Sequence, residues 1–262
     1  MFQSSSSSTC IQNVPKRVPR NHTTNSSSPT VPMKFVVISD THLLHDLLII
    51  PNGDVLIHCG DFTNLGLPAE VEMFFKFLVD QCDSKFEHVI MIVGNHEWAP
   101  DVVVGTKFNT FFSPENQKKL HAKYHLLLDD TITIQDRNKN PIKIHGTRYR
   151  GAWAFPVFFK DQRKKTTFEI PSDIDILLTH FPCNKNNMDV IYDGTSRGSE
   201  ELTTLLESTN YFTNLKIHCF GHNHDGRGFY YDTTQDRLYI NAVSVIGDKK
   251  DKIVKPPFVF EF

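Results

Sequence analysis

Seven residues with metal-binding side chains follow short apolar runs at five places in the chain: Asp40, His42, Asp61, Asn95, His180, His222 and His224. Aspartate offers a carboxylate oxygen, histidine a neutral imidazole nitrogen and asparagine a carbonyl oxygen. Such a mixed nitrogen and oxygen set suits Mn, Fe, Zn, Co or Ni better than Ca. The residue types therefore predict a site for transition-metal or similar divalent cations.

The spacing within two of these clusters supports this prediction. Asp40 and His42 are two residues apart, and so are His222 and His224. Alternate residues of an extended chain point the same way, so we expect the members of each pair to face one cation. Glycines stand beside the clusters where the backbone must turn sharply, at positions 60, 94 and 221. Most of these clusters taken alone are as typical of an ordinary turn, whereas His222 and His224 so close together are unusual without a cation. The ordered set of all five predicts a metal centre.

The apolar runs that precede the clusters predict buried strands, at residues 35–38, 55–57, 89–93, 174–178 and 216–220. Helical spacing of apolar residues predicts an amphipathic helix at 68–79, and further helices are expected at 115–124 and 199–206. Ligands gather at the carboxyl ends of the strands in such α/β sheets. The five clusters should therefore meet at one edge.

Four other runs predict antiparallel additions to this pattern. Residues 131–134 and 142–144 have the form of a hairpin, and residues 229–231 and 238–240 are expected as closing strands. The predicted fold class is therefore α/β with α+β features, built on mixed sheets.

The first 32 residues have a different composition from the rest. They contain serine runs and prolines at positions 15, 19, 29 and 32, which predicts a disordered tail before a folded domain at 33–262. The tail is basic and has no acidic residue, which leaves organellar targeting open, although its prolines oppose the amphipathic helix of a transit peptide. We expect a cytoplasmic protein.

The bulk composition limits the classes of partner. The net charge is -2, from 28 basic and 30 acidic residues, so no overall field attracts nucleic acid or an anionic membrane. Five cysteines without a CxxC motif support neither a disulfide framework nor a zinc ribbon. The apolar runs are far shorter than the roughly 20 residues of a membrane helix. We expect a soluble protein that recognises a small anion locally.

The ordered motifs SDTH, GD, GNHE, TH and GHNH resemble those of the calcineurin-like metallophosphoesterase superfamily, from Met33 to about Ser244. Within it, the stretches GDVLIHCGDFTNLG, IVGNHEW, DILLTHFPC and HCFGHNHDGRG are most similar to the small metallophosphoesterase-domain-containing group with brain-expressed vertebrate members. The resemblance implies a four-layer αββα sandwich of two mixed β-sheets flanked by helices.

The resemblance also implies a role for each motif residue. It assigns Asp40, His42 and His224 to one metal, Asn95, His180 and His222 to a second, and Asp61 to a bridge between both. His96 would be the proton donor and not a ligand. Some members of this group lack one histidine of the last motif, and its presence here favours an active enzyme.

The implied cofactors are two divalent metal ions, with Mn expected first and Fe, Zn, Co or Mg as alternatives. Two such ions bring about four positive charges and the aspartates remove about two, so the centre attracts a phosphate anion. A metal-bridging hydroxide would attack phosphorus, and His96 would protonate the leaving oxygen.

The resemblance favours a phosphodiesterase, with cyclic nucleotides as one candidate substrate. A phosphomonoesterase and a non-catalytic scaffold of the same fold stay open as alternatives. A protein serine/threonine phosphatase would have Arg-Gly shortly after the GD motif, where this chain has Asp61-Phe62-Thr63-Asn64-Leu65-Gly66, and a purple acid phosphatase would have a metal-binding tyrosine at the position of Asn64. Candidate contacts to the phosphoester or nucleotide are Arg227, Arg148, Arg150, Arg197 and His45.

Overall fold

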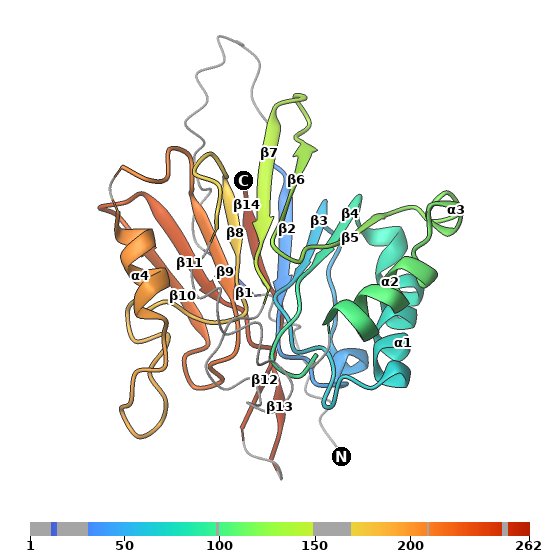
Figure 1. The fold of residues 1–262 in the computed structure, drawn as a ribbon, viewed down its shortest axis with the longest axis horizontal. Coiled ribbons are helices and arrows are strands. Elements are labelled where there is room, and N and C mark those ends of the chain that lie inside the picture. Colours follow the sequence, from blue (N-terminus) through green and yellow to red (C-terminus); the bar gives the residue numbers. More distant parts are fainter. Residues whose placement is uncertain (1–11, 15–30, 98–99, 149–168, 209, 248–250) are drawn as a thin grey trace, which may run out of the picture.

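The computed structural model consists of two six-stranded sheets that pack face to face between outer helices (Figure 1). It describes residues 12–14, 31–97, 100–148, 169–208, 210–247 and 251–262. Isoleucines, valines and phenylalanines from both sheets form a buried core between them. This core fixes the spacing of the two sheet edges from which the site is built.

The first sheet has the strand order β1-β14-β2-β3-β4-β5. Four adjacent strands are parallel: β2 (Lys34–Ile38), β3 (Val55–His58), β4 (His88–Met91) and β5 (Lys123–Leu126). The C-terminal strand β14 (Phe258–Glu261) runs antiparallel beside β2, and β1 (Gln12–Asn13) pairs with its outer edge. The carboxyl ends of β2, β3 and β4 therefore lie at one edge.

The second sheet has the order β10-β11-β9-β8-β7-β6. Its parallel strands are β7 (Pro141–Gly146), β8 (Ile176–Leu178), β9 (Ile217–Phe220) and β11 (Arg237–Asn241). The outer strands β6 (Asp130–Gln135) and β10 (Gly228–Asp232) are antiparallel to their neighbours. A separate antiparallel pair joins β12 (Val245–Ile246) to β13 (Ile253–Val254). Both large sheets are mixed.

Helices cover the outer face of each sheet and complete four layers (Figure 1). The first sheet is covered by α1 (Pro68–Phe77), α2 (Gly105–Phe111) and α3 (Pro114–Gln117), and the second by α4 (Glu200–Glu207). Short 3-10 turns span His45–Leu47 and Asp83–Lys85, and π-helical turns span Leu78–Cys82 and Pro100–Val104. A separate apolar cluster lies beneath each helical layer. The expected αββα sandwich is confirmed.

Most predicted elements form close to the expected positions, but the helix predicted at 115–124 is wrong over its second half. Only Pro114–Gln117 is helical, and the edge strand β5 begins at Lys123. The polar sequence after Pro114 favours a helix locally. Pairing of β5 with β4, and burial of the Tyr124 ring against Phe112 at a centroid distance of 4.2 Å, outweigh that preference.

The segment predicted as a disordered tail contributes residues 12–14 to the fold. The strand β1 pairs with β14, the Val14 N–H donates to the Val259 carbonyl at 3.0 Å, and the Val14 side chain joins the core between the sheets. These three residues depart from the expectation, and residues 1–11 and 15–30 lie outside the described residues. No helix in the described part of the chain has the length and apolar character needed to cross a membrane.

Candidate metal centre

The loops that leave β2, β3, β4, β8 and β9 bring all seven predicted ligands together. Their donor atoms form three overlapping groups within 4.8 Å: Asp40 with His42 and His224, Asp61 with His180 and His222, and His42 with Asp61 and His96. The Asn95 Oδ1 atom joins the second group, at 2.9 Å from His222 Nδ1 and 3.1 Å from His180 Nε2. The first two groups contain the residues that the motif resemblance assigns to separate metals, and the third, which joins them through His42 and Asp61, also contains His96, which the resemblance does not assign as a ligand.

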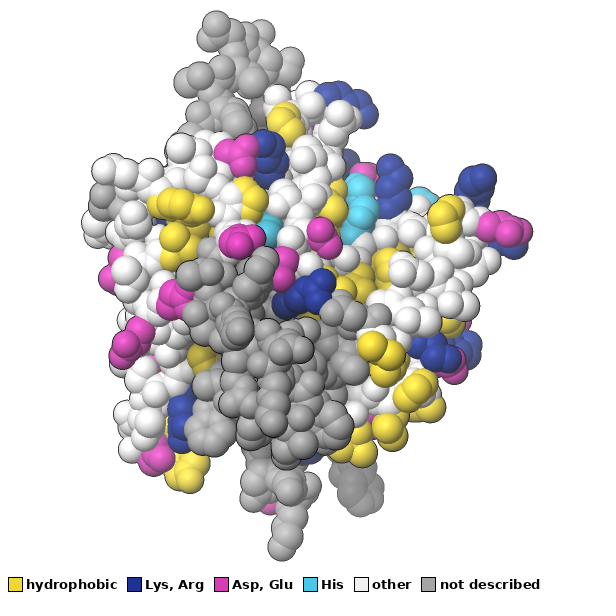
Figure 2. Space-filling view, in the orientation of Figure 1, with side chains coloured by type: hydrophobic (Ala, Val, Ile, Leu, Met, Phe, Trp, Pro, Cys, Tyr) yellow, Lys and Arg dark blue, Asp and Glu magenta, His cyan; other side chains and the backbone are white. Residues whose placement is uncertain are grey.

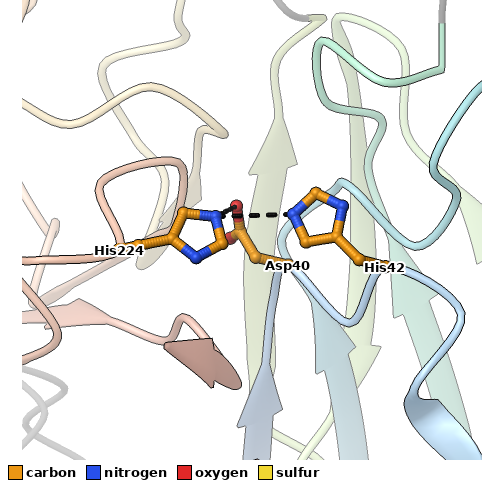
Figure 3. Close-up of side chains that lie close together, drawn as sticks. All are labelled: Asp40, His42 and His224. Carbon is orange, nitrogen blue, oxygen red and sulfur yellow. Dashed lines mark hydrogen bonds and ion pairs between the residues drawn. The ribbon is translucent and has the colours of Figure 1, made fainter. Parts of the chain in front are cut away.

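The first group joins the two sheets. Asp40 and His42 lie in the loop after β2, and His224 reaches them from the loop after β9 in the other sheet (Figure 3). The His42 and His224 rings are stacked at a centroid distance of 5.3 Å, and His224 Nε2 lies 3.5 Å from Asp40 Oδ1. A cation among these atoms would connect segments 182 residues apart.

Three predicted ligand imidazoles are oriented in the same way, by a hydrogen bond from Nδ1 to a backbone carbonyl. His42 donates to Thr63 at 3.2 Å, His180 to Cys59 at 2.7 Å and His224 to Val245 at 2.5 Å. Because a carbonyl can only accept, each Nδ1 carries the hydrogen, and in the neutral ring each Nε2 presents a lone pair to the centre. This is the usual support of a metal-binding histidine.

The donor atoms converge in a way that requires positive charge. His42 Nε2 and His224 Nε2 face each other at 3.4 Å, and His180 Nε2 lies 3.2 Å from Asp61 Oδ2. Lone pairs at these distances repel unless a proton or a metal ion lies among them. Two nitrogens bound at about 2.0–2.1 Å to one tetrahedral cation are separated by about 3.4 Å, so the donor set fits divalent cations.

The pKa shifts show how strongly these groups interact. Burial lowers the pKa of His180, but the Asp61 and Asp40 carboxylates outweigh burial and raise it to about 10. Burial would raise the pKa values of both carboxyls, yet His180 and the other imidazoles hold them below the ordinary value. Burial and His180 lower the pKa of His222 to about 4. In the metal-free protein, protonated His180 therefore supplies positive charge that a cation could replace.

The backbone is left-handed at four of the seven ligands, which corrects the extended chain expected from residue spacing. Asp40, His42, Asp61 and His222 have φ values of 52°, 44°, 57° and 68°. They do not alternate along an extended strand, and His222 and His224 belong to different groups. A non-glycine residue in this conformation costs about 1–3 kcal/mol and persists only where its surroundings hold it. The sharp loops after the strands bring the ligands together.

The predicted reason for the neighbouring glycines holds at only one of three positions. Gly60 has a φ of 94° and makes the expected sharp turn. Gly94 and Gly221 do not, but a Cβ atom on them would lie 2.2 Å from Asp61 Oδ1 and 2.1 Å from Asp40 Oδ2. A larger residue is excluded at these two positions because its Cβ atom would clash with a carboxylate oxygen.

Glu97 is a residue of this site that our sequence analysis did not single out. Its carboxylate is buried, and Oε2 accepts from the N–H groups of Asp61 at 2.9 Å and Gly94 at 2.8 Å. Oε1 accepts from the Thr63 N–H at 3.0 Å and the Thr63 hydroxyl at 2.7 Å. Glu97 thus ties the Asp61 loop to the Asn95 loop. The only sequence signal was its place in the GNHE motif.

His96 lies beside the second group with its ring oriented by two contacts. Its Nδ1 donates to the Asn64 carbonyl at 2.6 Å, and its backbone N–H donates to Asp61 Oδ1 at 2.8 Å. Its Nε2 lies 3.9 Å from Asp61 Oδ2, and the side chain is 37% exposed. The His96 ring therefore lies beside His42 and Asp61 at the centre, with part of its side chain exposed.

The predicted substrate contacts are dispersed. Arg227 stacks on the Phe258 ring at 4.2 Å and donates to the Pro256 carbonyl at 2.6 Å, so it anchors the C-terminal segment. His45 is almost completely buried, packed on Phe74 and Phe77, so the expectation that it lines the mouth of a pocket disagrees with its position.

The remaining arginines lie in loops. Arg148 follows β7 and pairs with Asp129, with Nε 3.4 Å from Oδ2. Arg197 lies between β8 and α4, where its N–H donates to the Asp189 carbonyl at 2.9 Å. Arg150 lies outside the described residues. Figure 2 shows acidic and basic side chains intermixed on the coloured part of the visible face.

Comparisons with known proteins agree with this geometry. Residues 33–226 match the family model of the calcineurin-like phosphoesterases. Metallophosphoesterase domain-containing protein 1 of Homo sapiens is 33% identical over 247 residues, which cover 87% of this chain and 70% of that protein. A UPF0046 protein of Caenorhabditis elegans is 32% identical over 87% of this chain and 80% of its own length.

A third relative has a different overall organisation. Probable rhamnogalacturonate lyase C of Emericella nidulans is 30% identical over 200 residues, which cover 75% of this chain but only 17% of that protein. The similarity concerns a small part of that relative.

Proposed function

This chain belongs to the calcineurin-like phosphoesterase family, whose members act on phosphoesters, and we propose that it is a phosphodiesterase dependent on two divalent metal ions. The observation that carries the proposal is the convergence of seven donor side chains at the edges of two sheets, in groups that overlap at His42 and Asp61. A complete ligand set argues against the non-catalytic scaffold. The choice of a diester rests on the motif resemblance.

Bound divalent cations would supply Lewis acidity, which lowers the pKa of a coordinated water and neutralises charge on the phosphoryl oxygens. Asp40, His42 and His224 would hold one ion, and Asn95, His180 and His222 the other, with Asp61 between them. Asp40 and Asp61 remain ionised because nearby imidazoles lower the pKa of both carboxyls. The residual positive charge would favour a phosphate anion over a neutral substrate.

His96 is the residue placed to handle the proton of the leaving group. Its Nδ1–H donates to the Asn64 carbonyl, so Nε2 is the ring nitrogen that can exchange a proton with a group bound at the centre. As imidazolium, His96 would donate the Nε2 proton to the departing alkoxide oxygen while the bond from phosphorus to that oxygen breaks. The T-shaped contact with the His42 ring, at 4.7 Å, keeps the donor beside the metal ligands.

Manganese is our first proposal for the resident metal. The donor set contains four imidazole nitrogens and three oxygen-bearing side chains, without a thiolate. This composition lies between the all-oxygen sites of Mg and Ca and the thiolate-rich sites typical of structural Zn, and it also permits Fe, Co or Zn.

The test is a metal-reconstitution assay. Purified protein is stripped of metal, reloaded separately with Mn, Zn, Co or Mg, and assayed against an aryl phosphomonoester, an aryl phosphodiester, and 2',3'- and 3',5'-cyclic nucleotides. We expect metal-dependent hydrolysis with a higher kcat/KM for diesters. The matched control is His222→Ala, which removes a single donor of one group.

The possible outcomes separate the alternatives. A strong preference for the monoester would overturn the diesterase proposal and support a phosphomonoesterase. Binding of two metal ions without hydrolysis of any of these esters would support the scaffold. Activity only on cyclic nucleotides would identify the substrate class.

A further inference from the structure

Two buried histidines outside the ligand set occupy equivalent places in the two sheets. His58 ends β3, three residues before Asp61, and His218 lies in β9, four residues before His222. Both are fully buried, with exposures of 1% and 0%. Each contacts a threonine that follows the neighbouring parallel strand, so the two sheets repeat one arrangement.

The hydrogen bonds of His58 define its tautomer. The Gly60 N–H donates to His58 Nδ1 at 3.2 Å, so Nδ1 carries no hydrogen. The hydrogen of the neutral ring is then on Nε2, which donates to the Thr41 hydroxyl oxygen at 3.0 Å. Thr41 stands between the predicted ligands Asp40 and His42 in the chain.

The second histidine has the same tautomer for a different reason. The Thr179 hydroxyl donates its only hydrogen to the Phe181 carbonyl at 2.6 Å. It must therefore accept from His218 Nε2, which lies 2.8 Å away. His218 Nδ1 is left as an acceptor, 3.7 Å from the Cys183 thiol. Thr179 directly precedes the predicted ligand His180.

The surroundings keep both rings neutral and immobile. The His58 ring lies 4.9 Å from Phe74 and 5.7 Å from Phe62, and the His218 ring lies 4.9 Å from Phe220. Burial lowers the pKa of each histidine to about 3. A neutral, immobilised ring with one donor and one acceptor nitrogen can orient a neighbouring hydroxyl without adding charge to the metal centre.

We propose that His58 and His218 are paired positioning residues, each of which fixes one metal-binding loop through a threonine hydroxyl. His58 holds the Asp40–His42 turn through Thr41, and His218 holds His180 through Thr179. The proposal deepens the metal-dependent function proposed above and rests on it. Neither histidine is a ligand.

The two positions should not be equally important. Asp40 and His42 both have a left-handed backbone, whereas His180 does not. A strained turn depends on every contact that opposes its relaxation, so loss of the His58 bond should allow more movement than loss of the His218 bond. His58 is therefore expected to have the larger effect.

The first test compares three replacements of His58 by the affinity of the full-length, metal-free protein for Mn²⁺, measured by calorimetric titration. His58→Phe removes both ring nitrogens. His58→Gln places an amide donor near the Nε2 position, and His58→Asn places an amide near Nδ1. We expect affinity about 10–100-fold weaker for the Phe and Asn variants, as for other partners that orient metal ligands, and near wild type for Gln.

The partner threonine supplies a matched control. Thr41→Val keeps the shape but removes the accepting oxygen, and Thr41→Ser keeps it. Valine should weaken Mn²⁺ binding as His58→Phe does, and serine should preserve it. The combination of His58→Phe with Thr41→Val should lose little more than either alone, because both remove the same bond.

Combining these variants with the loss of one metal ligand distinguishes the effect of His58 on the first group from the effect of His218 on the second. His224→Ala removes a ligand of the first group, so the remaining Mn²⁺ binding should be weakened by His218→Phe more than by His58→Phe. His222→Ala removes a ligand of the second group, and the order should reverse. Circular dichroism of every variant verifies that the folded protein is being titrated.

Two results would overturn the proposal. One is unchanged Mn²⁺ affinity in folded His58→Phe and Thr41→Val. The other is an equal loss of thermal stability in all three His58 variants without a selective effect on binding, which would make the ring a packing group. Metal binding is measured without a substrate, so the proposed hydrolysis can fail while this test still gives an answer.

Discussion

The two sheets build the two halves of the metal centre in different ways. The first half comprises the loops after β2, β3 and β4 and provides both carboxylates, the Asn95 amide, His42 and His96. The second half comprises the loops after β8 and β9 and provides only imidazoles, namely His180, His222 and His224. The half that carries the negative charge therefore differs in chemistry from the half that neutralises it.

The two halves also differ in backbone conformation, because left-handed residues are more frequent in the first half. In the first half, Asp40, His42 and Asp61 all have positive φ values, whereas among the ligands of the second half only His222 does. The strained half is also the one that contains Glu97, whose buried carboxylate accepts four hydrogen bonds. Placing carboxylates close together over glycines requires an unfavourable backbone, and a dense hydrogen-bond network holds it there.

The largest effect should follow from removal of a carboxylate in the first half. Asp61→Asn keeps the size of the side chain but removes the charge that His180 and the predicted cations require. We expect kcat/KM to fall at least about 10³-fold, equivalent to about 4 kcal/mol of transition-state stabilisation. Steady-state kinetics with an aryl diester measure the loss. The exposed Asp46→Asn variant is the control. A similar loss of kcat/KM in that variant would show that the effect is not specific to the carboxylate of the metal centre.

A large but substrate-dependent effect is expected at His96. His96→Ala should slow hydrolysis of an alkyl ester by about 10²–10⁴-fold, because the alkoxide leaving group needs a proton. A nitrophenyl ester, whose leaving group is a weak base, should be affected much less. Comparison of kcat for the two esters tests the acid role, and equal losses would contradict it.

Glu97→Gln tests whether metal binding by the first half depends on the hydrogen bonds that the Glu97 carboxylate accepts. An amide can accept at only one end, so either the Asp61 and Gly94 donors or the Thr63 N–H loses its partner. We expect Mn²⁺ affinity to weaken about 10–100-fold while the protein stays folded, as a calorimetric titration would detect. Glu115→Gln, at an exposed position, is the control. Wild-type affinity in the Glu97 variant would show that the strained backbone needs no such support.

A separate prediction concerns the pH dependence of folding stability, which should be alike in both halves. The folded pKa of His58 and of His218 is about 3, below the ordinary 6.5, so the unfolded chain binds more protons between these values. Each histidine therefore stabilises the fold above pH 6.5, and that stability is lost progressively as the pH decreases from 6.5 toward 3.

Urea unfolding of metal-free protein at several pH values measures this dependence. His58→Phe and His218→Phe should each flatten the loss of stability below pH 6.5, and the wild-type protein is the reference. A flattening in only one of the two variants would show that the halves are not built alike.

The sequence by itself determined the kinds of donor atom and the order of the elements that carry them. Short apolar runs that end in Asp, His or Asn predicted the strands and the edge at which they meet, because burial and strand periodicity are local properties. The family and the αββα arrangement followed from the ordered motifs. The residues brought together are the predicted ones, although their spacing argued for an extended backbone that the structure does not have.

Only the tertiary structure decided how these residues meet. The left-handed turns, the tautomers of His58 and His218 and the four bonds of Glu97 all depend on groups distant in the chain. The strand β5 likewise forms where local propensity favoured a helix, since β4 offers it hydrogen-bond partners. Long-range pairing and packing supply free energy that no local pattern contains, and they can outweigh a local backbone preference.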